Sequence, residues 1–310
     1  MKSMDVAALA ESLSEQSIHF ETEVSLKTLS TFRIGGVAPL VIYPSSIGEL
    51  IGSLLFLCGK GLPYEVVGNG SNLLFDDGRL ACVLIVTREI CGISRDGMTI
   101  TAECGVSLSR LASFAAQEGL SGLAFAKGIP GTVGGALFMN AGAYGGEMSM
   151  VVENSLVLDT KAGELFTVED HAFGYRQSIY MEHPEWVCLA VNFSLTSGVR
   201  EEIEAKMREF AQSRREKQPL EYPSAGSYFK RPEGYFAGKL IEDAGLKGVR
   251  IGDAAVSEKH AGFLINLGEA TAKDMLTLES LVRDKVASHF GVELRREVRL
   301  ISAEAIEKEL

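Results

Sequence analysis

Glycine dominates two short segments of this sequence, and both have the composition of loops that hold phosphate groups. Residues 128–146 read GIPGTVGGALFMNAGAYGG and contain seven glycines, and residues 68–72, sixty positions earlier, read GNGSN. Glycine takes positive φ readily and lets backbone N–H groups approach an anion closely. We therefore predict two loops that close on one ligand, with the pyrophosphate of a dinucleotide as the natural candidate.

The spacing of these glycines excludes two familiar nucleotide sites. Neither segment shows G-x-G-x-x-G opening a helix, and neither shows the phosphate loop G-x-x-x-x-G-K-[ST]. A plain turn explains residues 68–72 equally well, whereas the density of glycine and small residues in 128–146 favours ligand contact there. A nucleotide site of another architecture is indicated.

Three further positions place reactive side chains beside glycine or aromatic residues. Arg176, in FGYRQS, offers a fixed fork for a carboxylate or an enolate oxygen, although a surface cation is the plainer interpretation. Ser227, in PSAGSYFKRP, suits a proton donor or an exposed turn, and the lack of G-x-S-x-G argues against a hydrolase nucleophile. Glu297, in RREVRLI, is either a strand-edge ion pair or a proton shuttle.

Eight motifs, in order along the chain, resemble those of the UDP-N-acetylenolpyruvoylglucosamine reductase family. They are TFRIGG at 31–36, GNGSNLL at 68–74, GIPGTVGGALFMNAGAYGGE at 128–147, YRQS at 175–178, AGSYFKRP at 225–232, AGKLIEDAGLKG at 237–248, VSEKHAGFLIN at 256–266 and REVRLI at 296–301. Each motif alone is weak, but together they extend the resemblance over nearly the whole chain.

The resemblance implies an α+β fold, with a two-lobed FAD-binding domain of the vanillyl-alcohol-oxidase (PCMH) type and a C-terminal α+β substrate-binding domain. It also implies non-covalent FAD, with NADPH as co-substrate. Its FAD-binding residues are Arg33, Ile34, Gly35, Gly36, Gly68, Asn69, Gly70, Ser71, Asn72, Ile129, Pro130, Gly131, Thr132, Gly134, Gly135, Asn140, Gly142 and Ala143.

The implied reaction reduces UDP-N-acetylglucosamine enolpyruvate to UDP-N-acetylmuramate in peptidoglycan precursor synthesis. NADPH reduces the flavin, and hydride then passes to C3 of the enolpyruvyl group. Arg176 and Glu297 stabilise the enolate-like charge, and Ser227 gives the proton to C2. Tyr175, Lys217 and Lys230 match or suit substrate contacts.

The sequence departs from the family pattern in two places. Arg231 stands where the family motif often has asparagine, and no tyrosine-bearing insertion lies between Arg176 and Ser227. The chain thus resembles the shorter subtype of the family. Another FAD-dependent oxidoreductase of the same fold, acting on a small alcohol or hydroxy acid, is the alternative enzyme, and a non-catalytic sugar-nucleotide binding protein is the alternative outside enzymes.

Composition excludes several other classes. The net charge of −11 (30 Lys and Arg against 41 Asp and Glu) argues against a nucleic-acid surface, so an anionic ligand requires a local basic patch. The five cysteines form no C-x-x-C pair, and the histidines lack metal-site spacing, so we expect reduced thiols and no metal. The first residues lack the apolar core of a signal peptide, and the longest apolar stretch, 47–58, is too short to span a bilayer. We expect a cytoplasmic monomer without membrane contact.

The elements that must position these residues alternate between strands and helices. Capping and periodicity predict helices over 46–58, 108–118, 201–217, 238–244 and 272–290, and strands over 39–43, 64–67, 82–87, 98–103, 151–159, 163–167, 187–195, 254–256, 263–266 and 299–302. We predict a helical leader over 1–20, an FAD-binding domain over 21–216 with lobes 21–86 and 87–216, and a substrate-binding domain over 217–310, because prolines follow the charged helix.

Overall fold

The computed structural model describes residues 6–15 and 18–302. The chain divides into two compact units, here called the first unit and the second unit. The first unit contains the described residues up to 22 together with 40–69 and 82–214, and the second contains 23–39, 70–81 and the described residues from 215 onward. The chain passes from one unit to the other after residues 22, 39, 69, 81 and 214, so neither unit is one continuous stretch.

The helices agree closely with the predicted ranges. They are α1 (Val6–Glu15), α2 (Ile47–Gly59), α3 (Leu108–Gln117), α4 (Val133–Phe138), α5 (Arg200–Lys217), α6 (Ala237–Asp243) and α7 (Ala272–Phe290), with 3-10 helices η1 (Leu26–Thr28), η2 (Thr87–Glu89), η3 (Ala124–Gly128), η4 (Met148–Met150) and η5 (Ile179–Met181). The predicted leader helix corresponds to α1, while residues 1–5 and 16–17 lie outside the described part of the chain.

The strands also include several short ones. They are β1 (Phe20–Ser25), β2 (Val37–Ile42), β3 (Tyr64–Val67), β4 (Leu73–Phe75), β5 (Val83–Val86), β6 (Ile93–Asp96), β7 (Thr99–Glu103), β8 (Leu120–Ser121), β9 (Gly142–Ala143), β10 (Gly146–Glu147), β11 (Val152–Asp159), β12 (Glu164–Val168), β13 (Trp186–Ser194), β14 (Thr196–Ser197), β15 (Arg250–Ile251), β16 (Ala254–Val256), β17 (Leu264–Asn266) and β18 (Arg299–Ile301).

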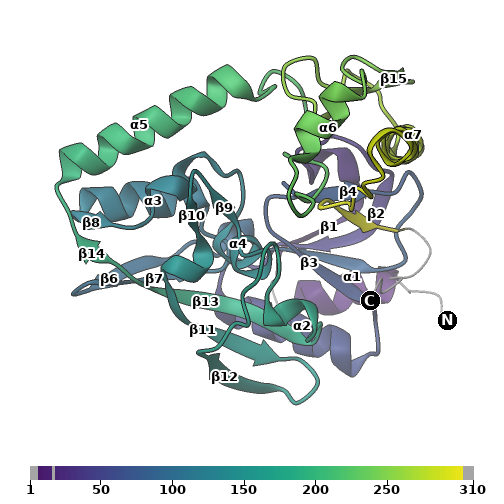
Figure 1. Ribbon diagram of the computed structural model, residues 1–310. Helices are drawn as coiled ribbons and strands as arrows, with labels where there is room; N and C mark the ends of the chain where they lie inside the picture. The colour runs from purple at the N-terminus through teal and green to yellow at the C-terminus, as the bar shows by residue number, and fades with distance from the viewer. Residues whose placement is uncertain (1–5, 16–17, 303–310) are drawn as a thin grey trace. The chain divides into compact units, whose positions relative to one another are not determined.

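The first unit contains two kinds of sheet. Strands β2, β5 and β3 are parallel neighbours within a sheet of order β1-β2-β5-β3, and the boundary between the units passes within β1 and β2. A second, antiparallel sheet has the order β12-β11-β13-β7-β6, and Figure 1 shows its long strands β11 and β13 running side by side.

Helix α2 shows why these elements form where they do. The Ser46 side chain accepts a hydrogen bond from the Glu49 backbone N–H, and the Glu49 carboxylate accepts one from the Ser45 N–H at 2.8 Å. The helix therefore begins with two of its exposed donors satisfied. Leu50 and Leu54 lie one turn apart on its buried face, in a core shared with the parallel strands.

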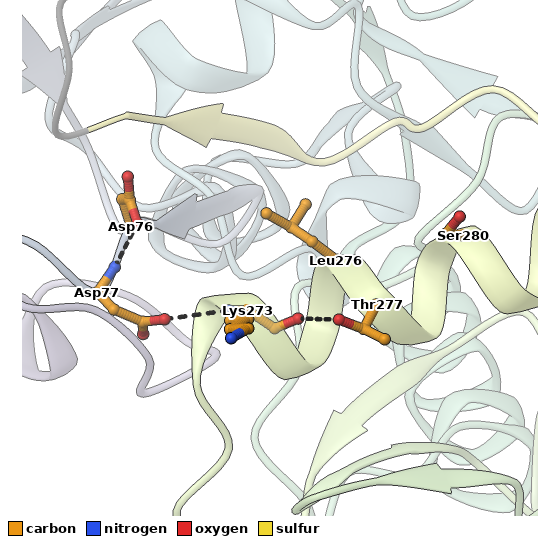
Figure 2. Close-up of a pocket in the computed structure, with 6 residues that line it drawn as sticks. All are labelled: Asp76, Asp77, Lys273, Leu276, Thr277 and Ser280. Atoms are coloured by element: carbon orange, nitrogen blue, oxygen red, sulfur yellow. Dashed lines mark hydrogen bonds between the residues drawn. The ribbon is translucent and has the colours of Figure 1, made fainter.

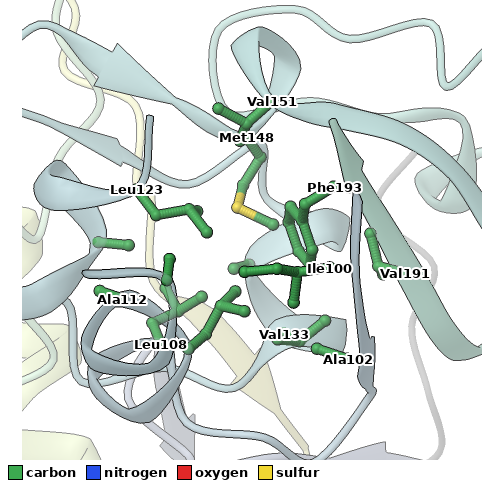
Figure 3. Close-up of a cluster of buried hydrophobic side chains, with 14 of the residues drawn as sticks. Ile100, Ala102, Leu108, Ala112, Leu123, Val133, Met148, Val151, Val191 and Phe193 are labelled. Carbon is green, nitrogen blue, oxygen red and sulfur yellow. The ribbon is translucent and has the colours of Figure 1, made fainter. Parts of the chain in front are cut away.

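A second apolar core supports the glycine-rich segment. Helix α4 contributes Val133 to it, strand β13 contributes Phe193, and η4 contributes Met148. Figure 3 shows these side chains converging with Leu108 of α3. We had predicted that the long glycine segment is a loop throughout. Its middle instead forms a short helix, α4, whose apolar face is buried.

The second unit packs α6 and α7 against short strands. Strands β15, β16 and β17 form an antiparallel sheet, and β18 pairs in parallel with β4. Helix α7 begins with a capping box between Thr271 and Asp274, and the Asp77 carboxylate accepts hydrogen bonds from the Ala272 and Lys273 N–H groups at 2.7 and 3.0 Å. The segment before β18 carries Glu297, so this unit positions one of the predicted catalytic residues.

Candidate active site

The start of the first predicted glycine loop contacts the second within the first unit. The Asn69 side-chain amide donates to the Pro130 carbonyl at 3.0 Å. Gly68 lies so close to Thr132 that a Cβ on this glycine would be 2.2 Å from the threonine Oγ1. Residues 68–69 therefore contact the segment that we predicted to close on the same ligand.

Helix α4 leaves few of its own donors for an anion. The Val133 N–H donates to the Val106 carbonyl, and the Gly134 N–H donates to the Cys104 carbonyl, both at 2.8 Å. The backbone of Gly135 is exposed instead, and a Cβ there would meet only Thr132 Oγ1, at 3.5 Å. Of the adjacent pair, Gly135 is thus the glycine that internal packing does not require.

Arg176 is attached to the glycine-rich segment. Its guanidinium donates to the Asn140 carbonyl at 3.3 Å and to the Gly142 carbonyl at 3.0 Å, and it lies 5.2 Å from the centre of the Tyr175 ring. These contacts fix the plane of the fork against residues that we predicted to bind FAD. Tyr175 is exposed beside it, as a substrate contact requires.

Through its side chain, the buried Asn140 holds the turn that carries Arg176 and the glycine-rich segment together. It is 1% exposed, its side-chain amide donates to the Gly174 carbonyl at 2.9 Å and to the Glu147 carboxylate at 3.2 Å, and its Oδ1 accepts from the Ser149 N–H. The side chain therefore joins the glycine-rich segment to the turn that carries Arg176. This contact shows a structural use for a residue that we predicted to bind FAD.

Left-handed backbone conformations gather at the predicted site residues. Within the described chain, six residues other than glycine have positive φ, and three of them are Arg33 (φ 55°), Asn140 (φ 42°) and Arg176 (φ 55°). Such conformations are uncommon for residues with a Cβ and concentrate where function demands them.

The second unit places the TFRIGG motif beside the end of the first glycine turn. The Thr31 N–H donates to the Gly70 carbonyl at 3.2 Å, and a Cβ on Gly70 would lie 2.0 Å from the Leu29 carbonyl oxygen. The hydroxyls of Ser30 and Thr31 are buried and have no hydrogen-bond partner among the described residues. Buried hydroxyls without partners are costly, so these two suit a ligand that supplies the missing hydrogen bonds.

Ser227 and Glu297 lie on two paired segments of the second unit. The Glu297 N–H donates to the carbonyl of Tyr228, the residue after Ser227, at 2.8 Å, and Phe229 and Arg296 form an antiparallel bridge. The Asn72 side-chain amide donates to the Glu297 carbonyl at 3.2 Å. One predicted FAD-binding residue and two predicted catalytic residues are thus brought together, with Ser227 exposed and Glu297 half-buried.

A buried polar cluster holds these paired segments to α7. The Tyr228 hydroxyl donates to the Glu279 carboxylate at 2.9 Å, and Arg296 lies 3.4 Å from the same oxygen. Burial raises the pKa of the Tyr228 phenol well above its usual range, so the hydroxyl keeps its proton and remains the donor. The cluster ties the segments that carry Ser227 and Glu297 to one helix.

The remaining predicted residues are divided between the units. Arg176 belongs to the first unit, whereas Ser227 and Glu297 belong to the second. Lys217 is exposed at the end of α5, and Lys230 is half-buried, with its N–H bonded to the Arg295 carbonyl.

Arg214 is a site candidate that the sequence did not reveal. It lies on the last turns of α5, where a Cβ on Gly128 would be 3.3 Å from its Cδ. Burial lowers the pKa of its guanidinium, and Tyr144 opposes this effect. In the sequence, Arg214 is one of many charges on the helix predicted over 201–217, and no local signal separates it from the others.

One hollow lies elsewhere, in the second unit (Figure 2). It has a volume of about 490 Å³ and is lined by Asp76, Asp77, Lys273, Leu276, Thr277 and Ser280. None of these is a predicted site residue, and the Asp77 carboxylate already caps α7. We assign this hollow no part in catalysis.

The described residues also bear on the expectations about membrane contact and thiols. No helix there is long and apolar enough to cross a membrane. All five cysteines are unpaired thiols, with Cys82 and Cys104 buried.

Comparison with known proteins gives matches in both parts of the chain. A family described as FAD binding domain matches residues 38–169, and one described as UDP-N-acetylenolpyruvoylglucosamine reductase, C-terminal domain, matches residues 218–301. The curated UDP-N-acetylenolpyruvoylglucosamine reductase of Clostridium beijerinckii is 48% identical over 87% of this chain and 88% of its own. The protein of the same name from Clostridium novyi is 42% identical over 98% of this chain and 99% of its own.

A solved structure matches over a similar length. The crystal structure of UDP-N-acetylenolpyruvylglucosamine reductase from Thermus caldophilus has a TM-score of 0.77 and 35% sequence identity, and the match covers 91% of this chain and 98% of that one.

Proposed function

This chain belongs to the UDP-N-acetylenolpyruvoylglucosamine reductase family, and we propose that Arg176, Ser227 and Glu297 are the residues with which it carries out the family's reaction. It is a flavin-dependent oxidoreductase of peptidoglycan precursor synthesis, with NADPH as the reductant. The predicted α+β fold, with an FAD-binding domain and a C-terminal substrate domain, is confirmed.

The residues present fit FAD. The unpartnered hydroxyls of Ser30 and Thr31 offer hydrogen bonds that the protein itself does not use, and exposed Gly135 leaves room beside its Cα. We assign to the cofactor these residues and the predicted set in 33–36, 68–72 and 129–143. When bound, FAD supplies the hydride chemistry that links NADPH to the enolpyruvyl carbon.

The protein's own side chains manage charge and protons in this proposal. Hydride addition at C3 of the enolpyruvyl group leaves negative charge at C2 and on the carboxylate. Arg176 presents a planar guanidinium, already oriented by Asn140 and Gly142, to that charge. Glu297 stabilises the same charge as a hydrogen-bond donor, and Ser227 delivers a proton to C2.

The observation that carries this proposal is the pairing of the Ser227 and Glu297 segments. Their backbones are joined by the hydrogen bond from Glu297 to Tyr228, so the two groups are held on adjacent segments that the Tyr228–Glu279 hydrogen bond ties to α7. A proton donor and a charge-stabilising acid need such fixed neighbouring positions.

Ser227→Ala tests the proton-donor role. We expect reduction of bound FAD by NADPH to survive in this variant, since that step needs no proton at C2. Reoxidation by UDP-N-acetylglucosamine enolpyruvate should slow by about 100-fold or more, the usual loss when a general acid is removed. Both steps can be followed separately by stopped-flow absorbance of the flavin, with Ser224→Ala as the neighbouring serine control. Equal loss of both steps would remove Ser227 from this role.

The alternative oxidases of the same fold are separated by how the flavin is held. They often tether it through His or Cys near the glycine segment, and the sequence has neither residue between Cys104 and His171. Acid precipitation should therefore release the yellow chromophore into the supernatant. Pigment that stays with the pellet would contradict the proposal.

Three further expectations, on domains, location and oligomeric state, complete the proposal. We assign FAD binding to residues 21–216 and substrate binding to 217–310, with Tyr175, Lys217 and Lys230 as substrate contacts. In this proposal the protein acts as a cytoplasmic monomer. Sedimentation of the purified holoenzyme tests the monomer.

A further inference from the structure

A buried chain of three hydroxyl and imidazole groups lies beneath the turn that carries Arg176. The Ser155 hydroxyl on β11 is 2.9 Å from His171 Nε2 and 2.5 Å from the Tyr180 hydroxyl. Ser155 is fully buried, and the other two are 3% and 4% exposed. Neither the reaction nor the cofactor contacts described above use these three residues.

The direction of the hydrogen bonds follows from the surroundings. The His171 imidazole also interacts with the Glu169 backbone, and we assign its proton to Nδ1, which leaves Nε2 as the acceptor toward Ser155. The Ser155 hydroxyl then donates to Nε2 and accepts from Tyr180. Burial lowers the pKa of His171 and raises that of Tyr180, so both groups stay neutral. Each donor among these three side chains then has an acceptor.

The two outer members of this chain mark the ends of one tight turn, residues 171–180, here called the Arg176 turn. The Ile179 N–H donates to the His171 carbonyl at 2.8 Å, which closes the turn at its base. Gly174 and Gln177 exchange two backbone hydrogen bonds, of 3.1 and 3.2 Å, which close it at its tip. Arg176 lies within that tip with φ 55°, a strained conformation that the base must maintain.

We propose that Tyr180, Ser155 and His171 act as positioning residues that hold both ends of the Arg176 turn on β11 and so fix the guanidinium for the substrate. This inference rests on the proposed function of Arg176. Ser178 reinforces the same turn through a 2.7 Å hydrogen bond to the Phe138 carbonyl, which ties it to the end of α4. The anchored turn spares Arg176 the cost of ordering when substrate arrives.

Tyr180→Phe removes one hydroxyl while keeping the buried ring. We expect NADPH to reduce the bound FAD within about twofold of the wild-type rate, and reoxidation by the enolpyruvyl substrate to slow by about tenfold, or 1.4 kcal/mol in barrier height. Ser155→Ala should behave alike, and it serves if the tyrosine variant does not fold. In hydrogen exchange, the amides of Gly174 and Gln177 should exchange faster in both variants.

Tyr64→Phe is the matched control. Its hydroxyl lies in the same unit, is also shielded, and donates to Thr160 at 2.9 Å, but it has no contact with the Arg176 turn. It should reproduce any general loss of stability without the selective loss in the substrate step. In an Arg176→Lys background, adding Tyr180→Phe should cost less than twofold more, because the hydroxyl acts through Arg176.

Several results would overturn the inference. These are equal slowing of both steps, the same profile in Tyr64→Phe, additive losses in the Arg176→Lys background, or unchanged exchange at Gly174 and Gln177. A wild-type protein that fails to turn over the enolpyruvyl substrate would contradict the proposed function instead. The exchange measurement would then decide alone whether the buried chain holds the turn.

Discussion

Glycine serves two different purposes in the predicted FAD site, and only one of them concerns the ligand. Gly70 has φ 60°, and a Cβ on it would collide with the Leu29 carbonyl, so the fold itself requires glycine there. Gly135 has room for a Cβ, and its backbone is exposed within α4. A glycine that packing does not require, in a helix that glycine weakens, points to close approach by a ligand.

Gly135→Ala distinguishes these purposes. The apo protein should be as stable as the wild type or up to about 1 kcal/mol more stable, because alanine is the better helix former. Its affinity for FAD should fall by about tenfold, since the added methyl group occupies space meant for the cofactor. Thermal unfolding of the apo protein and fluorescence titration with FAD measure the two effects.

Gly52→Ala provides the control for this comparison, because Gly52 lies inside α2 with no atom within 4 Å of its added Cβ and is not a predicted ligand contact. It should change stability in the same direction and leave FAD affinity unchanged. Unaltered FAD binding in Gly135→Ala would separate α4 from the cofactor.

The sequence predicted the roles of single residues where a motif marks them. It did not predict the roles of residues whose importance depends only on their neighbours in the fold. The segments with Ser227 and Glu297, seventy positions apart in the sequence, are paired by the fold, and the resemblance had already joined their roles. The buried Ser155 and the half-buried Arg214 carry no motif. Their significance comes from neighbours that only the folded chain brings close.

At the scale of elements, α7 depends on a residue from a distant part of the sequence. Asp77 lies almost two hundred positions before the helix and accepts hydrogen bonds from its first two N–H groups. The helix buries Met275, Leu278 and Val282 in the core of the second unit and supplies Glu279 to the polar cluster below the site. Destabilising the N-terminus of α7 should therefore also destabilise the segments that carry Ser227 and Glu297.

Asp77→Ala should reduce the free energy of unfolding by about 1–2 kcal/mol, because it removes two capping hydrogen bonds and a negative charge at the positive end of the helix. Urea unfolding followed by circular dichroism measures the change. Asp284→Ala, an exposed aspartate in the middle of the same helix, should shift stability by less than about 0.5 kcal/mol. Equal effects of the two substitutions would show that the cap contributes nothing specific.

Element predictions succeeded where caps and periodicity are strong. The prediction of 272–290 matches α7, and 64–67 matches β3. The short helix α4 was missed because two adjacent glycines suggested a loop, and β1 was missed because its sequence, FETEVS, has exposed polar residues at most positions. In both cases burial against other elements decides the structure, and local propensity does not report it.

At the scale of the whole molecule, the second unit is assembled from three separate stretches of chain. Strand β18 near the C-terminus pairs with β4 in 70–81, and the Asn266 amide donates to the Phe32 carbonyl in 23–39 at 3.1 Å. Prolines and charge runs mark the boundary near residue 215 in the sequence, but nothing in the composition shows that 23–39 and 70–81 group with the residues beyond it.

A fragment of residues 215–310 should therefore fail to fold by itself. It would lack the partner of β18, the Asp77 cap of α7 and the Phe32 and Leu74 side chains of its core. We expect the circular dichroism signal of the fragment to change gradually with urea, without a cooperative transition. The full chain should unfold cooperatively under the same conditions. A sharp transition in the fragment would show that the C-terminal stretch is an independent domain.

The interleaving of the units also limits how such a gene can change by recombination. A single crossover between two relatives near residue 215 would join one parent's β4 to the other parent's β18, and one parent's Asp77 to the other parent's α7. Such chimaeras would inherit mismatched pairs even if each parental half were sound. Homologues that exchange this gene should therefore do so as a whole.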